Sequence, residues 1–190
     1  MASAVAADSD GPVITHLIGR LAATGGRVAG AGLAVLAQLL PEPSDRELAE
    51  LELRANDERP PGWADQFGDV EVAAAVQLCD PLGDAGLLVL ELRWPDAAPL
   101  ALVLLIDHNR SSSIKAAALL GRSADALLTS LVAQSEDELV RTVLTAADAR
   151  SLIEAAIWPP SPTDPGELNP GDLRPLVEWL VARLPSGGTA

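Results

Sequence analysis

The pattern of apolar and polar positions predicts that the first third of the chain is helical. Three helices are predicted there, over residues 13–23, 28–40 and 45–55. Gly25 and Gly26 separate the first two, because glycines next to polar residues interrupt helical periodicity. Ser44 and Glu47 have the spacing of a capping box, which predicts the start of the third helix. The polar, proline-containing segment 56–62 is then expected to be a linker.

The middle of the chain changes to short apolar runs of strand length. These runs are residues 70–79, 87–94 and 100–107. Turn-forming sequences separate them, and connections this short favour an antiparallel meander over parallel strands, which need a longer crossover. Residues 138–145 are ambiguous: Ser135 and Glu138 fit the start of a helix, but the β-branched residues that follow favour a fourth strand.

Residues 100–121 are predicted to run from a strand through a polar loop into a helix that ends at Gly121. Ser123 is expected to cap a following helix to about residue 133. Thr145 and Asp148 fit the cap of another helix, which ends near residue 157. An extended, proline-rich segment should come next.

The C-terminal end is predicted to be an amphipathic helix that docks on an apolar surface. Its stripe consists of Leu173, Leu176, Val177, Leu180, Val181 and Leu184. Docking within the chain is preferred over docking on a partner, because a terminal stripe of this kind packs locally when a core is available.

These patterns predict an α+β protein. We expect N-terminal helices, a central antiparallel meander of three or four strands, covering helices and a C-terminal amphipathic helix. The expected divisions are a tail over 1–11, a helical segment over 12–56, an α+β domain over 60–158, a proline-rich linker over 159–171 and a docking helix over 172–185.

The charge of the chain limits its partners. The formal net charge is −14, from 27 acidic and 13 basic residues, and the basic residues form no cluster. Nucleic acid and anionic membranes would be repelled, so neither is expected as a partner. A protein partner with a basic surface, self-association or a cation fits better. Cys79 is the only cysteine, which excludes an internal disulfide, and a cytoplasmic location is expected.

Polar side chains that follow the first and third predicted strands form the main candidate site. In a meander these strands point the same way, so Asp80, Asp84, Asp107 and His108 should lie at one end of the sheet, with Lys115 nearby. The three carboxylates and the imidazole suit a divalent cation, and Asp107, His108 and Lys115 suit acid–base catalysis. Alternatively, these residues serve only to cap turns.

A second candidate is an anion site at the start of the helix predicted after residue 111. Ser112, Ser113 and Lys115 would lie in its first turn, where free N–H groups and the helix dipole attract anions. In the alternative interpretation, one serine is simply the N-cap. No other cofactor signature is present in the sequence, and it has no phosphate-binding P-loop motif.

Three segments carry a resemblance to known proteins: PPGWADQFG at 60–68, DPLGD at 80–84 and LIDHNRSSSIKAAAL at 105–119. Through these segments, residues 60–157 resemble a family of proteins from high-GC actinobacteria for which no activity is established. The matching positions are Asp80, Gly83, Asp84, Asp107, His108, Asn109 and Lys115. Ala116 departs from the family, which tends to have an aspartate there, and serines replace glycine in the loop. The resemblance therefore identifies residues but no reaction.

Two functions follow as hypotheses. The leading one is a cytoplasmic, non-enzymatic interaction or regulatory module, because the chain is acidic, has a docking helix and lacks a catalytic signature. The alternative is a small enzyme or ligand-binding protein that uses the carboxylate, histidine and lysine cluster with a divalent cation or an anionic small molecule. Convergence of those side chains in a concave site would favour the alternative, and dispersal would favour the module.

Overall fold

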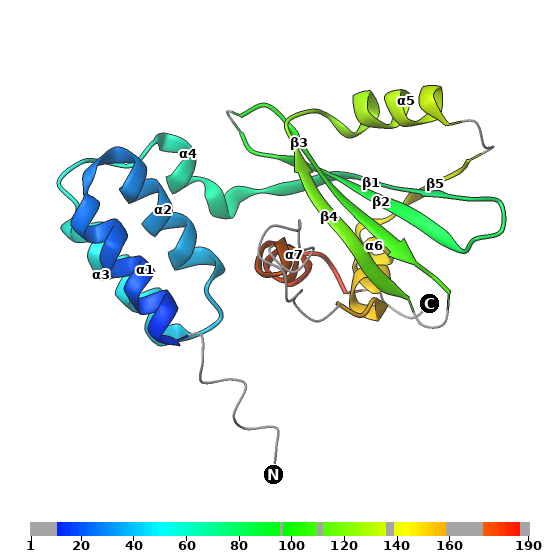
Figure 1. The fold of residues 1–190 in the computed structure, drawn as a ribbon. Helices are drawn as coiled ribbons and strands as arrows, with labels where there is room; N and C mark the ends of the chain where they lie inside the picture. The colour runs from blue at the N-terminus through cyan, green and yellow to red at the C-terminus, as the bar shows by residue number, and fades with distance from the viewer. Residues whose placement is uncertain (1–10, 96, 110–111, 136–138, 159–172, 187–190) are drawn as a thin grey trace, which may run out of the picture. The chain divides into compact units, whose positions relative to one another are not determined.

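The computed structural model describes residues 11–95, 97–109, 112–135, 139–158 and 173–186 (Figure 1). The chain divides into two compact units, Met1–Asp69 and Val70–Ala190. Most of the predicted N-terminal tail, residues 1–10, and the predicted linker 159–171 lie outside the described residues. In the described part, no helix has the length and apolar character needed to span a membrane.

The first unit contains the three predicted helices, α1 (Gly11–Thr24), α2 (Gly26–Leu39) and α3 (Pro43–Ala55), followed by the short α4 (Gly62–Asp65) and the 3-10 turn η1 (Phe67–Asp69). Their shared core contains Ile18, Leu33, Ala37, Leu40 and Ala49.

The predicted capping box at the start of α3 is wrong. The helix begins at Pro43, with Glu42 as a cap that makes no side-chain hydrogen bond. The fixed φ of proline suits the first helical position, so Pro43 starts the helix before Ser44 can cap it.

The second unit is built on a five-stranded antiparallel sheet. Its strands are β1 (Glu71–Cys79), β2 (Ala85–Arg93), β3 (Leu100–Asp107), β4 (Ser113–Leu120) and β5 (Val140–Leu144). Their order is β4-β3-β2-β1-β5, so the first four strands form a meander and β5 joins it beside β1. The α+β class and the meander are confirmed, and the preference for a strand over 138–145 is confirmed by β5.

The helix predicted after residue 111 is wrong, because that segment is strand β4. Ile106 of β3 pairs with Ile114, which is fully buried. On the opposite edge of β4, Ser113 forms a parallel bridge with Ile157. These two pairings override the helical preference of the alanines and leucines that follow, since strand formation depends on tertiary context.

Three helices cover the sheet, α5 (Ala124–Gln134), α6 (Ala146–Ala155) and α7 (Arg174–Val181). Figure 1 shows α5 over one face of the sheet and α6 and α7 over the other. We call these the α5 face and the α6–α7 face. The predicted caps are confirmed: Ser123 accepts the N–H of Ala126, and Thr145 and Asp148 form a capping box.

Strand alternation gives each face its own apolar core. The α5 face contributes Val76, Leu78, Val89 and Ala101, which pack with Ala124, Leu127 and Leu128 of α5. The alternate positions on the α6–α7 face include four fully buried leucines, Leu88, Leu90, Leu102 and Leu104. Both faces of the meander are therefore covered, which explains its nearly continuous apolar sequence.

The C-terminal stripe packs within the chain, as preferred from the sequence. Val177, Leu180 and Leu184 are buried, and an Nη1–H of Arg150 in α6 donates to the carbonyl of Leu184 at 2.7 Å. The predicted stripe did not include Trp179, which is also buried. The centroid of its ring lies 3.8 Å from the Arg183 guanidinium carbon.

Candidate functional site

The turn between β1 and β2 is organised by the Asp80 carboxylate. Its oxygens accept the backbone N–H groups of Leu82 at 2.8 Å, Asp84 at 3.4 Å and Ala85 at 2.7 Å. The hydrogen bond from Ala85 is the main cause that lowers the pKa of Asp80. Gly83 occupies the position with φ of 75°, which a side chain would strain. Asp80 therefore shapes the turn and stays ionised.

Asp107 and Lys115 form an ion pair on the surface. The Lys115 Nζ lies 3.5 Å from one carboxylate oxygen of Asp107, and the other oxygen accepts the backbone N–H of Asn109 at 2.9 Å. A pair this exposed contributes at most about 1 kcal/mol to stability.

His108 lies on the other side of the sheet from Asp107. Asp107 shares the α5 face with Leu105, whereas the His108 ring reaches Gly86, which lies on the α6–α7 face. Side chains of consecutive strand residues point to opposite faces. The sheet therefore separates the imidazole from the carboxylate and ammonium groups with which it was expected to act.

Three side chains surround the position that a side chain would take at Gly86. They belong to Gln77, Cys79 and His108, and we call them the Gly86 cluster. A Cβ at Gly86 would lie 3.0 Å from the Cys79 Sγ, 3.2 Å from the Gln77 Nε2 and 3.3 Å from the His108 Nε2. The His108 Nδ1 lies 3.2 Å from the Ser112 Oγ, while its Nε2 is buried and has no hydrogen-bond partner in the described part of the chain.

The Cys79 thiol in the Gly86 cluster is not an activated nucleophile. Burial, and then the nearby charge of Asp80, raise the pKa of Cys79 above its ordinary value. The thiolate is the nucleophilic form, so a raised pKa lowers reactivity at neutral pH. The cluster is better described as a group of side chains packed closely around Gly86, where an added Cβ would be crowded.

The predicted residues share one end of the sheet without forming one site. Asp80 and Asp84 lie in the turn from β1 to β2, and Asp107 and His108 lie where β3 ends; the His108 N–H donates to the Asp84 carbonyl at 2.8 Å. The expectation that the three aspartates lie at the same end is confirmed. Across the described residues, no group of three or more histidine, cysteine or acidic side chains is arranged to hold a metal ion.

The predicted anion site required a helix after residue 111, and that helix is absent because the segment forms strand β4. Ser112 and Ser113 lead into strand β4, where the Ser112 carbonyl accepts the Ile157 N–H at 2.8 Å and the Ile114 N–H donates to the Ile157 carbonyl at 2.9 Å. The backbone here is used in sheet pairing and offers no helix N-terminus. The Lys115 ammonium group forms an ion pair with Asp107.

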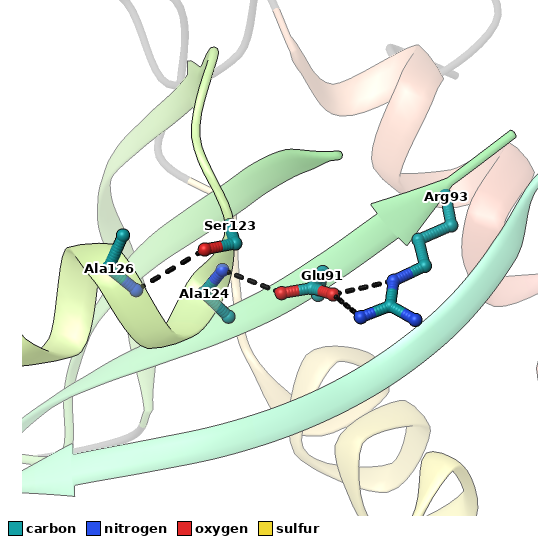
Figure 2. A network of polar contacts seen from close by, with 5 residues as sticks. All are labelled: Glu91, Arg93, Ser123, Ala124 and Ala126. Carbon is teal, nitrogen blue, oxygen red and sulfur yellow. Dashed lines mark hydrogen bonds and ion pairs between the residues drawn. The ribbon is translucent and has the colours of Figure 1, made fainter. Parts of the chain in front are cut away.

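Sequence reasoning missed the buried carboxylate of Glu91 (Figure 2). Glu91 lies on the α5 face of β2 and is only 4% exposed. One oxygen accepts the N–H of Ala124 at 2.8 Å, at the first turn of α5. The other accepts the Arg93 Nε–H at 2.7 Å and an Nη2–H at 2.5 Å. A single glutamate inside the apolar run of β2 was the available signal, and its role is to anchor α5 to the sheet.

The two outer edges of the sheet differ. At the β4 edge, the backbone of Ile157 covers Ser112 to Ile114 through two hydrogen bonds. At the opposite edge, β5 pairs with β1 only and has no other strand partner within the described residues. Four of its five residues are exposed, among them Val140 at 51% and Val143 at 74%.

A comparison with known proteins identifies no relative: no family model, curated protein or solved structure matches the chain. The resemblance of residues 60–157 to actinobacterial proteins therefore stays a prediction, and functional arguments rest on the geometry described above.

Proposed function

We propose that the chain is a cytoplasmic, non-enzymatic interaction module that binds a partner protein at the outer edge of β5. The observation that supports this proposal most directly is the exposure of Val140 and Val143 on a strand that pairs with β1 alone among the described residues. An unpaired edge presents a row of backbone donors and acceptors to which another strand can add.

The sequence of β5 has little of the usual protection of an edge strand. Natural sheets protect edges with charged side chains, especially lysine, and with proline, bulges, short strands or a covering segment. Strand β5, VRTVL, is five residues long and has one charged side chain, Arg141, but it contains neither lysine nor proline, and its register with β1 has no irregularity. The β4 edge, by contrast, has Lys115 and a register shift against β3, and Ile157 covers its first residues. This difference supports a docking role for β5.

Charge and shape indicate the kind of partner. The net charge of −14 attracts basic proteins electrostatically, beyond the range of direct contacts. We therefore expect an extended, basic segment of another protein to pair with β5, with apolar side chains against Val143 on the α5 face. A second copy of this chain carries the same acidic charge and would be repelled.

The dispersal of the predicted site residues also supports the module over the enzyme. Asp80 binds turn N–H groups, Asp107 pairs with Lys115, and His108 lies on the opposite face of the sheet from Asp107. Each side chain has a structural contact of its own, and general acid–base catalysis requires groups that reach one substrate atom.

Hydrogen exchange with a defined peptide tests this proposal. The probe is a ten-residue peptide of alternating valine and lysine, compared with the same peptide carrying glutamate in place of lysine. We expect the basic peptide to slow amide exchange over residues 140–144, and the acidic peptide to have no effect there. Val143→Lys should abolish the slowing, because it places a charge on the edge that the peptide covers.

Val132→Lys is the matched control, since Val132 is exposed at 54% but lies on α5. This variant should bind the basic peptide as the unmodified chain does. The proposal is wrong if the basic peptide leaves exchange over 140–144 unchanged, or if both variants lose binding equally. Slowing that depends on the concentration of the chain alone, without peptide, would identify a second copy as the occupant and overturn the choice of partner.

A further inference from the structure

A cavity of about 590 Å³ lies between α6 and α7, on a part of the second unit that the proposed function does not use. Side chains of both helices line it, together with Ile157 and Trp158, which follow α6. Its volume is within the range of about 300 to 1,000 Å³ that is typical of small-molecule sites. We propose that this cavity binds a small organic carboxylate with an apolar body.

The apolar part of the ligand is matched by the cavity walls. Ile153 and Ala156 of α6 and Val181 of α7 are buried side chains that contribute to the lining. Ile157 also lines the cavity but is 57% exposed, which is unusual for a large aliphatic side chain beside a concave surface. A hydrocarbon or aromatic group in the cavity would remove this apolar surface from water.

Two guanidinium groups, one from each helix, provide the polar part. In α7, the Arg174 Nε–H donates to Glu178 at 2.7 Å, and its Nη groups have no partner among the described residues. In α6, Arg150 uses its Nε–H for Glu154 at 2.8 Å and one Nη1–H for the carbonyl of Leu184.

The guanidinium N–H groups that have no acceptor favour a negatively charged ligand. Each lining glutamate is already paired with an arginine four residues before it on its own helix. The remaining N–H groups of Arg174, and the Nη2 group of Arg150, are donors without acceptors in the described part of the chain. A carboxylate accepts such donors in charge-assisted hydrogen bonds, which a neutral amide cannot match.

Isothermal titration with 4-phenylbutyrate and its neutral amide, 4-phenylbutyramide, tests this proposal. The two probes share the apolar body and differ in charge. We expect the acid to bind at least roughly tenfold more tightly than the amide, in line with the extra strength of charged hydrogen bonds. Arg174→Gln should remove most of that difference.

Arg54→Gln is the matched control, because Arg54 also forms an ion pair with a glutamate four residues away but lies on α3. It should bind the acid like the unmodified chain. Ala182→Phe places a ring into the cavity from an exposed position, and should abolish binding of both probes without the loss of a buried side chain.

Three results would overturn the proposal. Failure of both probes to bind would show that the cavity takes no such ligand. Equal affinity for acid and amide would remove the role of the guanidinium groups. Binding of the acid that survives Ala182→Phe would place the ligand elsewhere. These outcomes are independent of peptide binding at β5, so the two proposals can fail separately.

Discussion

Replacement of Glu91 by glutamine tests the role of the buried carboxylate in Figure 2. The variant keeps the size of the side chain but removes the negative charge of the carboxylate. That carboxylate accepts hydrogen bonds from the Ala124 N–H at 2.8 Å and from two N–H groups of Arg93. We expect the second unit to lose stability and the first turn of α5 to open more often.

The magnitude follows from the contacts. A hydrogen bond to a charged group contributes about 1.5 to 3 kcal/mol and a neutral one about 0.5 to 1.5 kcal/mol, so the change at Ala124 costs about 1 to 1.5 kcal/mol. Loss of a negative charge near the start of a helix adds about 0.3 to 1 kcal/mol. The Arg93 side chain is 61% exposed and can return to water, so its release adds little. The expected total is roughly 1.3 to 2.5 kcal/mol.

Equilibrium unfolding in urea measures this loss, and hydrogen exchange at the start of α5 locates it. Glu50→Gln is the control, because Glu50 is half exposed and pairs with Arg54 on a helix surface; about 0.5 kcal/mol or less is expected there. If Glu91→Gln is as stable as the unmodified chain, or if exchange at Ala124 is unchanged, then the carboxylate does not anchor α5.

Three further outcomes are expected. Gly86→Ala should destabilise the second unit by about 1 to 3 kcal/mol, because the new Cβ would lie 3.0 Å from the Cys79 Sγ, and Cys79→Ala in the same chain should recover part of the loss in urea unfolding. The lowered pKa of Asp80, caused mainly by its hydrogen bond from Ala85, gives stability that is present at neutral pH and lost as the pH falls below about 4 through the folded-state pKa. Asp80→Asn should therefore lose less stability than the unmodified chain between pH 7 and pH 3, and equal losses would contradict the role of Asp80. Leu180→Asp changes a buried side chain that packs within the chain, so it should lower the melting temperature by the same amount at low and high protein concentration. Loss of association with an unchanged melting temperature would instead mean that α7 docks on a partner.

Much of the sheet could be predicted because local patterns and tertiary pairing agree there. The turns around residues 80–86 and 95–99 have strong turn compositions, and the apolar runs between them became β1, β2 and β3 with bounds close to those expected. The capping pattern of Thr145 and Asp148 also matched the structure, because both partners lie within one helical turn. Local signals of this kind depend little on the rest of the chain.

The parts that could not be predicted depend on distant residues. Strand β4 has a sequence suited to a helix, and only its pairing with β3 and with Ile157 makes it a strand. The candidate site was predicted from proximity at one end of the sheet, but proximity does not determine which face a side chain occupies. The place of Glu91 became clear only when α5, more than thirty residues later in the sequence, was seen to begin beside it.

The segment after α5 has a consequence for the growing chain during synthesis. The meander from β1 to β4 is complete by residue 120, but β5 pairs with β1 only after residue 140, and Ile157 reaches β4 later still. Until then, both outer strands of the meander lack neighbours, and each contains small apolar residues of the kind that pair with other chains. A chain of which only the first 139 residues have left the ribosome would hold a nearly finished sheet with two unpaired edges. Protection of this fold against aggregation therefore depends on how quickly residues 140–157 follow.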